Sequence, residues 1–411
     1  MGMAYGDLVN LVRGSSAFRR KRRLQPAGGV SDKLFPPTYP GESKGSPPRH
    51  VFERRRIEGR DVWCVLIDSV QSQANRLEEA LLRAAEENRI TLPRLVVDFA
   101  PSGLNSIGTI SSLEAPHRIF DAILRDSMLN GTALSKTDLG DSLRRATPRD
   151  ASAILEVSPS ALLFGAWNST SGGGGVGARF ARAIVSEIIG VDVPVEELAP
   201  DRRTGEIDVR TAGRRTGSRI DPLGILRSVE VFKGDAGWDI TKEAAGNGAT
   251  PVRPSEINHG NIVPSVTPLG ITCSYAEQTA VITLAGLRRL RFGGSAARDD
   301  AARALIAALG LLALIEQDAQ GYALRSRCDL VCDGPAPLEI VDFDGSTKTL
   351  ELSRDEAVAL YAEAFEAARA AGFALVSEPV RLLPQDRLVH IVRESMNRAL
   401  ADEAEDDDAD G

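Results

Sequence analysis

Residues 62–99 carry the hydrophobic pattern that most restricts how this chain can fold. Residues 62–67 are an apolar run of strand length, residues 72–89 have the periodicity of an amphipathic helix, and residues 94–99 are a second apolar run. The apolar face of the helix comprises Leu77, Ala80, Leu81 and Ala84. Either Asp68 or Ser69 can cap its first turn. The segment therefore predicts a β-α-β unit.

The remainder of the chain predicts an α+β fold around this unit. We expect strands at 160–167, 227–232, 271–275, 279–284, 322–331 and 338–343, and helices at 178–189, 296–316, 353–371 and 385–400. Residues 192–222 and 234–268 are rich in Pro, Gly, Arg, Asp and Asn, and we interpret both as long insertions. The expected organisation is a basic arm (1–60), a core (61–345), a helical segment (346–401) and an acidic, disordered tail (402–411).

The bulk composition is that of a soluble globular protein. Hydrophobic residues make up 43% of the 411 residues and charged residues 26%. No apolar run reaches the length of about 20 residues that spans a bilayer, and the N-terminus lacks an apolar signal region. We therefore expect a cytoplasmic protein with no membrane partner. The chain holds no internal sequence repeat, so any repetitive assembly that it forms must be built from many copies of the chain.

Charge is distributed unevenly although the net charge is −8. Five consecutive cations occupy residues 19–23, and the Pro- and Gly-rich composition of residues 19–50 predicts an extended loop there. Further cationic clusters are Arg202, Arg203, Arg210, Arg214, Arg215 and Arg219, and then Arg288, Arg289 and Arg291. These clusters favour an anionic partner such as a phosphate backbone. Nearby aromatic residues that can stack on bases are Phe18, Trp167, Phe180 and Phe292.

The glycine run at 172–177 supports two readings. Gly172, Gly174 and Gly177 match the G-x-G-x-x-G pattern between a predicted strand and a predicted helix, which favours a nucleotide-binding enzyme. Against this, the first glycine follows the strand at some distance, and Ala178 stands where a phosphate-binding lysine would be required. A glycine loop before a helix can instead contact RNA phosphates, with Arg179 and Arg182 in its first turns.

Residues for metal binding or catalysis are sparse. The cysteines Cys64, Cys273, Cys328 and Cys332 form no C-x-x-C pair, and Cys328, Cys332 and His259 make a poor metal set, so no metal and no cofactor are expected. The histidines His50, His117, His259 and His390 lie in no nucleophile motif. Asp342 and Asp344 at a strand end leave a metal-dependent nuclease as a further alternative.

Six blocks of sequence resemble the backbone subunit of the type I-U (also called I-G) CRISPR Cascade effector, a member of the RAMP superfamily. They are residues 23–29 (RLQPAGG), 32–39 (DKLFPPTY), 68–78 (DSVQSQANRLE), 113–118 (LEAPHR), 164–190 and 217–222 (GSRIDP). The resemblance implies an RRM-like (ferredoxin-like) core with finger- or thumb-like insertions and additional C-terminal helices. It further implies a non-catalytic subunit, copies of which stack head to tail along one guide RNA. The implied partners are that CRISPR RNA, target DNA, a guide-processing subunit and a large subunit.

The resemblance and the basic clusters together predict the residues that bind RNA. They are Arg19, Arg20, Lys21, Arg22, Arg23, Lys33, Gln71, Ser72, Asn75, Arg76, His117, Arg118, Trp167, Ser169, Gly173, Gly174, Arg179, Arg214, Arg215 and Arg219. We expect them to hold the sugar-phosphate backbone, so that the base edges of the guide stay free to pair with target DNA. A polar residue in these motifs can equally brace a loop that touches RNA, and Asn75 and Arg76, inside the predicted helix, fit that structural role best.

Overall fold

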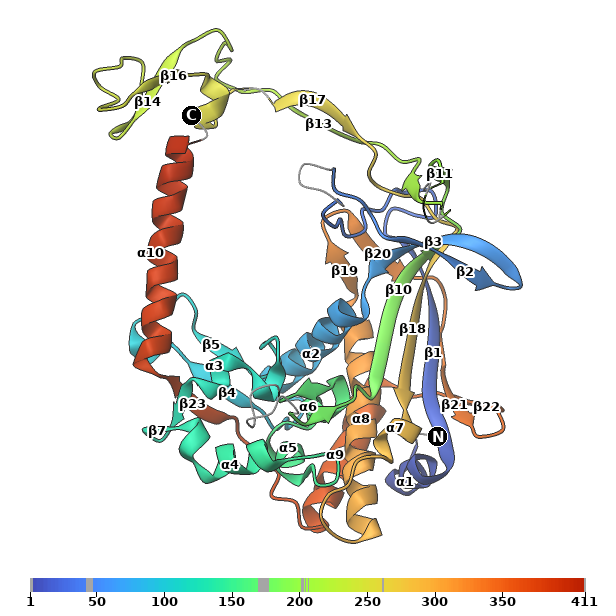
Figure 1. Cartoon of the computed structure of the whole chain (residues 1–411). Helices are drawn as coiled ribbons and strands as arrows, with labels where there is room; N and C mark the ends of the chain where they lie inside the picture. The colour runs from blue at the N-terminus through green and yellow to red at the C-terminus, as the bar shows by residue number, and fades with distance from the viewer. Residues whose placement is uncertain are drawn as a thin grey trace. The chain divides into compact units, whose positions relative to one another are not determined.

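The computed structural model describes residues 3–41, 47–168, 177–200, 203, 205, 207–260 and 262–409. The chain divides into two compact units. The first comprises Met1–Arg210 and Ile271–Gln385, and the second comprises Thr211–Gly270 and Asp386–Gly411. Both units mix helices with strands (Figure 1), which confirms the predicted α+β class.

A sheet of nine described strands, all paired antiparallel, organises the first unit. Its spatial order is β19 (Tyr322–Arg325), β20 (Cys328–Cys332), β1 (Ser15–Pro26), β18 (Tyr275–Thr283), β10 (Ile184–Val191), β3 (Arg60–Asp68) and β2 (Phe52–Ile57). Beside β1, β21 (Leu338–Asp342) and β22 (Thr347–Leu350) extend the sheet.

The strand β1 corrects the prediction for the N-terminal region. The expected extended loop over residues 19–50 is wrong as far as Pro26, because these residues pair with β18 on one side and with β20 and β21 on the other. A run of cations suits a central strand here because acidic side chains and an aromatic ring from other elements meet it on both faces. A short helix, α1 (Tyr5–Gly14), leads into the strand.

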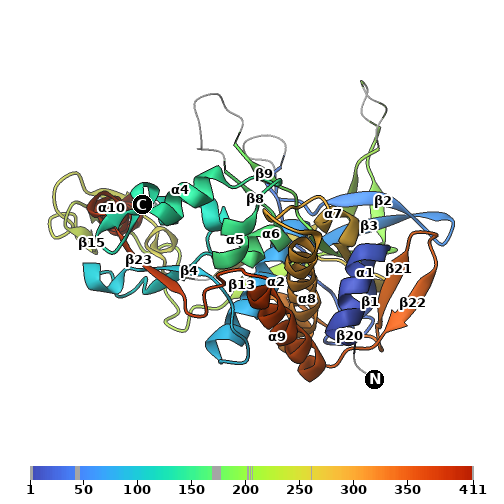
Figure 2. The same cartoon turned by 90° about the horizontal axis from the view of Figure 1, so that it is seen from below.

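Helices α2 (Val70–Glu86) and α8 (Ala296–Gln320) pack side by side over one face of this sheet, and α9 (Arg354–Ala370) packs against α8 (Figures 1 and 2). Each helix starts at a serine whose hydroxyl accepts a main-chain N–H, namely Ser69, Ser295 and Ser353. The predicted helices at 72–89, 296–316 and 353–371 are thereby confirmed, as is the capping role of Ser69. The short helix α7 (Leu284–Leu287) links β18 to the segment before α8.

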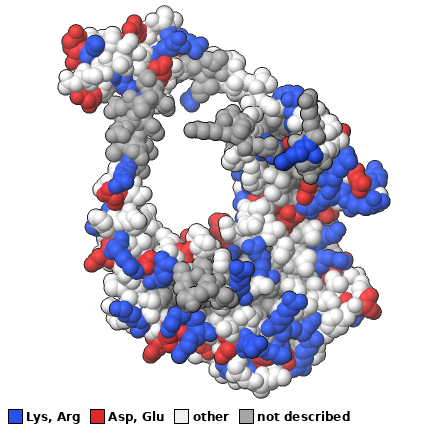
Figure 3. Space-filling view, in the orientation of Figure 1, with Lys and Arg blue, Asp and Glu red and all other residues white. Residues whose placement is uncertain are grey.

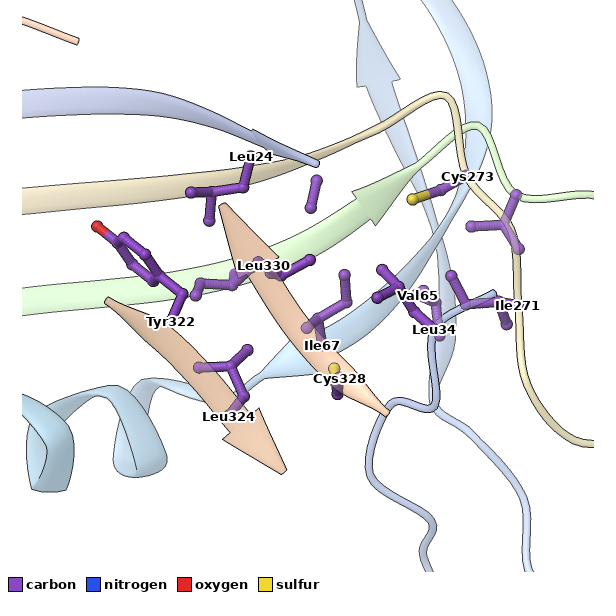
Figure 4. Close-up of a cluster of buried hydrophobic side chains, with 13 residues drawn as sticks. Leu24, Leu34, Val65, Ile67, Ile271, Cys273, Tyr322, Leu324, Cys328 and Leu330 are labelled. Atoms are coloured by element: carbon purple, nitrogen blue, oxygen red, sulfur yellow. The ribbon is translucent and has the colours of Figure 1, made fainter. Parts of the chain in front are cut away.

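Figure 4 shows the apolar core at one end of the sheet. Side chains of β1 and β3, such as Leu24, Val65 and Ile67, meet Tyr322 and Leu330 from β19 and β20. All five are at most 4% exposed. Because β19 and β20 come late in the chain, this core joins residues from its first and last thirds.

In chain order, β1, α2, β10, β18, α8 and β20 have the succession β-α-β-β-α-β, with other elements between them. The hairpin of β2 and β3 is inserted before α2, and β3 pairs with the outer side of β10. The strand predicted at 94–99 is present as β4 (Leu95–Asp98), but it belongs to a different sheet from β3. The predicted β-α-β unit therefore does not close within one sheet.

The second sheet of the first unit has the order β5 (Thr109–Ser111), β4, β23 (Val380–Pro384), β6 (Ser127–Leu129) and β7 (Thr132–Ala133). Short helices accompany its strands: η1 (Ala100–Ser102) lies between β4 and β5, η2 (Arg118–Phe120) and α3 (Ala122–Arg125) lie between β5 and β6, and η3 (Leu134–Lys136), α4 (Asp138–Arg145), α5 (Ser152–Val157) and α6 (Pro159–Phe164) follow β7. The expected strand at 160–167 is wrong, because α6 occupies most of it and only β8 (Ala166–Trp167) is extended. Pro159 at the start of the helix fits its first turn.

The expected helix at 178–189 is also wrong. This segment forms β9 (Arg179–Phe180) and most of β10. Its residues Ile184, Val185, Ile188, Ile189 and Val191 are β-branched, which favours a strand. The strand predicted at 279–284 is present within β18, whereas the strand predicted at 271–275 is wrong, because only Tyr275 belongs to β18 and residues 272–274 are in no strand.

The second unit contains two small sheets and one long helix. Strands β13 (Arg215–Arg219) and β17 (Ile262–Thr267) form a two-stranded ribbon, and β15 (Gly237–Asp239), β14 (Val231–Gly234) and β16 (Thr250–Val252) form a three-stranded sheet. The sheet packs on η4 (Pro254–Ile257) through Val231, Val252 and Ile257. The helix α10 (Asp386–Ala409) matches the prediction at 385–400, and the strand predicted at 227–232 appears later, as β14. A further pair of strands, β11 (Val195–Glu197) and β12 (Val209–Thr211), precedes the ribbon.

Candidate nucleic-acid interface

An open hollow of about 730 Å³ in the first unit brings together residues that are far apart in the sequence. Its lining comprises Gln71, Pro116, His117, Arg118, Phe164, Gly165, Ala166, Trp167, Arg179, Phe180, Ala181 and Arg182. Five of these, Gln71, His117, Arg118, Trp167 and Arg179, are among the predicted RNA-binding residues. The described lining holds three arginines and no acidic residue, so an anion is the ligand that its charge favours.

Two short strands position an aromatic ring and a cation at this hollow. Trp167 of β8 pairs directly with Arg179 of β9, and the Arg179 guanidinium lies 4.5 Å from the centre of the indole ring. The next pair along the ladder joins Ala166 to Phe180, whose buried ring stacks on Phe120. Trp167 is 48% exposed, an unusual state for so large an apolar side chain. An exposed indole beside an arginine is suited to stacking on a nucleic-acid base.

Arg118 enters the hollow with its charge already matched. Its Nε and Nη2 donate to the two carboxylate oxygens of Glu78 at 2.6 and 2.8 Å, and its Nη1 donates to the Gly165 carbonyl at 3.1 Å. Glu78 lies on α2 and is 1% exposed. Burial raises the pKa of the Glu78 carboxyl, and the hydrogen bonds from Arg118 oppose that rise. Arg118 also has a φ of 53°, in the left-handed region that residues with a side chain rarely adopt.

Arg182 differs from Arg118 in its partners. Its Nε donates to the carbonyl of Phe164 at 3.0 Å, and its Nη1 lies 3.4 Å from the carbonyl of Val70. Burial lowers the pKa of the Arg182 guanidinium and the charge of Arg118 lowers it further, while Glu78 acts in the opposite direction. Arg182 is absent from the list of predicted RNA-binding residues, although the glycine run and the residues after it indicate Arg182 and Arg179 as candidate phosphate contacts. Its position just beyond the glycine run, beside Arg179, was the available signal.

The polar motif at residues 68–76 is mostly structural. The buried carboxylate of Asp68 accepts from Ser72 Oγ and Gln73 Nε2, both at 2.8 Å, and from Arg76 Nε at 2.9 Å. Arg325 of β19 adds a fourth hydrogen bond, at 3.2 Å. Ser72 and Arg76 therefore brace the start of α2 against β19. Gln71 is exposed at the hollow, and Asn75 is exposed on the helix.

The basic run on β1 splits between the two faces of the sheet. Arg20 and Arg22 pair with Asp318 of α8 on the covered face. Arg19 pairs with Glu339, Lys21 lies 3.8 Å from Glu277, and the Arg23 guanidinium lies over the Tyr275 ring at 4.3 Å on the other face. Each of the five cations thus meets an acid or an aromatic ring of this chain. Lys33 is half-buried beside the bridge between Leu34 and Ile271.

Other predicted residues lie elsewhere or outside the described part. Arg214, Arg215 and Arg219 belong to the second unit, where the latter two are exposed on β13. Arg214 donates to the carbonyl oxygens of Ala212 and Gly213. Ser169, Gly173 and Gly174 lie outside the described residues, as do Gly172 and Arg202.

Sequence reasoning also gave no site role to the hairpin of β2 and β3. Lys and Arg side chains gather there on the face shown in Figure 3. They include Arg54, Arg56 and Arg60, all exposed. Arg54 stacks on Trp63 at 4.9 Å and pairs with Glu197, and Arg56 lies 3.5 Å from Asp61. Because Arg54 and Arg56 are paired with acids of this chain, whereas the described lining of the hollow has no acidic residue, the hollow is the better candidate for binding an anion.

The structure bears on both enzyme alternatives. The dinucleotide-binding reading required a helix directly after the glycine run, and β9 follows it instead. Asp342 accepts hydrogen bonds from Ser15 at 2.6 Å and Lys348 at 3.0 Å, which hold the pKa of its carboxyl below the usual value. Asp344 accepts from the main-chain N–H of Ser346 at 2.9 Å. Among the described residues, no group of three or more His, Cys, Asp or Glu side chains is placed to hold a metal ion.

Comparison with known protein families gives a match over the part of the chain that contains the hollow. Residues 18–195 match the family described as CRISPR-associated protein GSU0053 (Cas_GSU0053). The matched span runs from β1 into β11 and contains every residue that lines the hollow. No curated protein matches the sequence. Within the described part of the chain, no helix is both long and apolar enough to cross a membrane.

Proposed function

We propose that this chain is the RNA-binding backbone subunit of a type I-U (I-G) Cascade complex, on the premise that residues 18–195 match a CRISPR-associated family. In this proposal, copies of the chain stack head to tail along one guide RNA in the cytoplasm. The subunit catalyses no reaction. It holds the guide for pairing with target DNA, together with a guide-processing subunit and a large subunit.

The observation that carries the proposal is the hollow at β8 and β9. It presents an exposed indole, an adjacent exposed guanidinium and a half-buried one, and its described lining includes no carboxylate. Aromatic faces bind bases whatever their sequence, and arginines bind phosphates whatever the base. This chemistry suits a protein that holds an RNA without reading it and leaves recognition to base pairing.

The main sheet gives further support. In the first unit of the chain, the strands of this sheet and the helices α2 and α8 have the β-α-β-β-α-β succession that an RRM-like core requires. A subunit that contacts the next copy through two different surfaces generates a filament, because such contacts do not close. Binding along one shared strand multiplies the modest affinity of each copy.

The test is purification from cells that carry a CRISPR array, followed by size-exclusion chromatography with absorbance at 260 and 280 nm and sequencing of the bound nucleic acid. We expect large particles that contain repeat-derived RNA. The double variant Trp167→Ala/Arg179→Ala should give particles depleted of RNA, while the control Phe343→Ala, which changes an exposed ring outside the hollow beside Arg288, should not. A nucleic-acid-free monomer from the unmodified chain at low salt, where phosphate contacts are strongest, would overturn the proposal.

A further inference from the structure

We infer that Arg182 is the phosphate-binding residue of the hollow, and that Arg118, which the sequence motif singles out, is a positioning residue that sets the place of Trp167. The inference rests on the proposed function and goes beyond it, since it divides two neighbouring arginines between different roles. The ligand is a backbone phosphate of a single strand whose base stacks on Trp167.

The geometry of Arg118 leaves it little to offer an anion. The carboxylate of Glu78 takes two of its nitrogens and the carbonyl of Gly165 takes the third. A fork-to-fork pair of this kind with a buried acid matches the guanidinium charge and fixes its orientation. Because Gly165 comes just before β8, the contact ties the start of that strand to α2. The left-handed backbone of Arg118 is the local cost of reaching both partners.

The geometry of Arg182 is that of a cation held in place without a direct ion pair to any described residue. Two main-chain carbonyls, at the end of α6 and the first residue of α2, orient its guanidinium. No carboxylate of the described residues lies within ion-pair distance of it. Burial and the charge of Arg118 both lower the pKa of Arg182 because they disfavour its charged form. A phosphate bound beside Arg182 would stabilise that charged form.

Trp167 and Arg179 define the form of the ligand. A base can lie on the exposed indole only if it is unpaired, or at the end of a stack, so the hollow suits a single strand. Arg179, exposed at the hollow and set over the indole, adds a second cation beside the same ring. Arg182, half-buried in the same lining, then meets the phosphate.

The experiment compares Arg182→Gln with Arg118→Gln in the full-length chain. Glutamine removes the positive charge and shortens the side chain. Its amide can replace the Nε–H that Arg182 donates to Phe164, but it does not reach the acceptors of the Nη groups of either arginine. Binding of a labelled single-stranded RNA is followed by fluorescence anisotropy over a range of salt concentrations. We expect Arg182→Gln to weaken binding about tenfold and to reduce the slope of log Kd against log salt by about 0.7, the value for one lost phosphate contact. Arg182→Lys should retain most of the slope.

Arg118→Gln should leave the slope unchanged and shift the emission of Trp167, measured in a Trp63→Phe/Trp238→Phe background. The opposite pattern, with the slope lost in Arg118→Gln and retained in Arg182→Gln, would overturn the assignment. Single-stranded DNA of the same sequence distinguishes a contact with phosphate from a contact with ribose. If Arg182→Gln loses the same slope with DNA, the contact is with phosphate; a loss of slope with RNA alone contradicts the inference. If Arg182→Gln binds normally while Trp167→Ala does not, only this inference fails; if both bind normally, the proposed function fails with it.

Discussion

Arg20 of β1 donates two hydrogen bonds to the carboxylate of Asp318 on α8, at 2.5 and 3.0 Å, although the two residues lie 298 positions apart. Arg20 is 2% exposed, and its Nη2 also donates to Gln278 of β18 at 3.1 Å. Tyr322 completes the group by donating to Asp318 at 2.6 Å. The network therefore joins the first strand of the main sheet to its central helix and to β18 and β19.

Replacing Arg20 by alanine should destabilise the fold by about 2–4 kcal/mol, because Asp318 would keep a charge that is no longer matched by its closest partner. Lys21→Ala is the matched control. Its side chain is 61% exposed in an ion pair of 3.8 Å, and we expect a loss below about 0.5 kcal/mol. Chemical denaturation of both variants measures the difference, and equal losses would show that the buried network contributes nothing of its own.

The buried acid Asp68 should behave in the same way. Asp68→Ala removes an acceptor shared by Arg76, Arg325 and two uncharged side chains, and we expect a loss of about 3–5 kcal/mol. Asp61→Ala, which disrupts only the exposed pair with Arg56, should cost less than about 0.5 kcal/mol. A small effect of Asp68→Ala in thermal unfolding would contradict its role as the anchor of the motif.

Glu316 should make the stability of the protein depend on acid pH. Burial alone would raise the pKa of this carboxyl, but hydrogen bonds from Arg354 and Arg89 outweigh burial and hold it below its usual value of 4.5. A lowered pKa stabilises the folded state above the ordinary value, and this contribution is lost as pH falls through the folded-state value. Glu316→Gln should therefore cost about 1–3 kcal/mol at pH 7. The gap from the unmodified protein should narrow below pH 4.5, and a constant gap would rule out the ionised carboxylate as its cause.

Trp167→Ala should weaken RNA binding about tenfold, within the range that base stacking contributes. Trp167→Phe should retain part of the affinity because an aromatic face remains, and the ring control Phe343→Ala should bind normally. Anisotropy measurements at one fixed salt concentration are sufficient here. Full affinity in Trp167→Ala would mean that the indole does not contact the RNA.

The sequence predicts the helices of this fold well and several of its strands poorly, for identifiable reasons. A capping serine and an apolar face in the sequence predict the helices α2, α8 and α9. By contrast, α6 is buried on all sides, so its short apolar run has no polar face and resembles a strand. The strand β10 follows a glycine run, a pattern that predicts a nucleotide-binding turn and a helix after it.

The error at β1 has a different origin, in the distance between partners. A run of five cations is normally a solvated segment. Here its counter-charges, Glu277, Asp318 and Glu339, lie more than 250 residues further along the chain, and no local pattern connects them to it. The site shows the same limit. His117, Trp167 and Arg179 were predicted from their motifs, whereas the contrast between Arg118 and Arg182 depends on Glu78, which only the folded chain brings beside them.

The placement of β1 also has a consequence for how the protein is made. This strand is synthesised before its neighbours β18, β20 and β21, which end at residues 283, 332 and 342. At a synthesis rate of about 5–20 residues per second, the nascent strand waits for roughly 15–65 s before its partners exist. Lys and Arg are among the residues least prone to pair prematurely with another strand. We therefore expect the cations that later tie β1 into the sheet to disfavour premature pairing of this strand during translation.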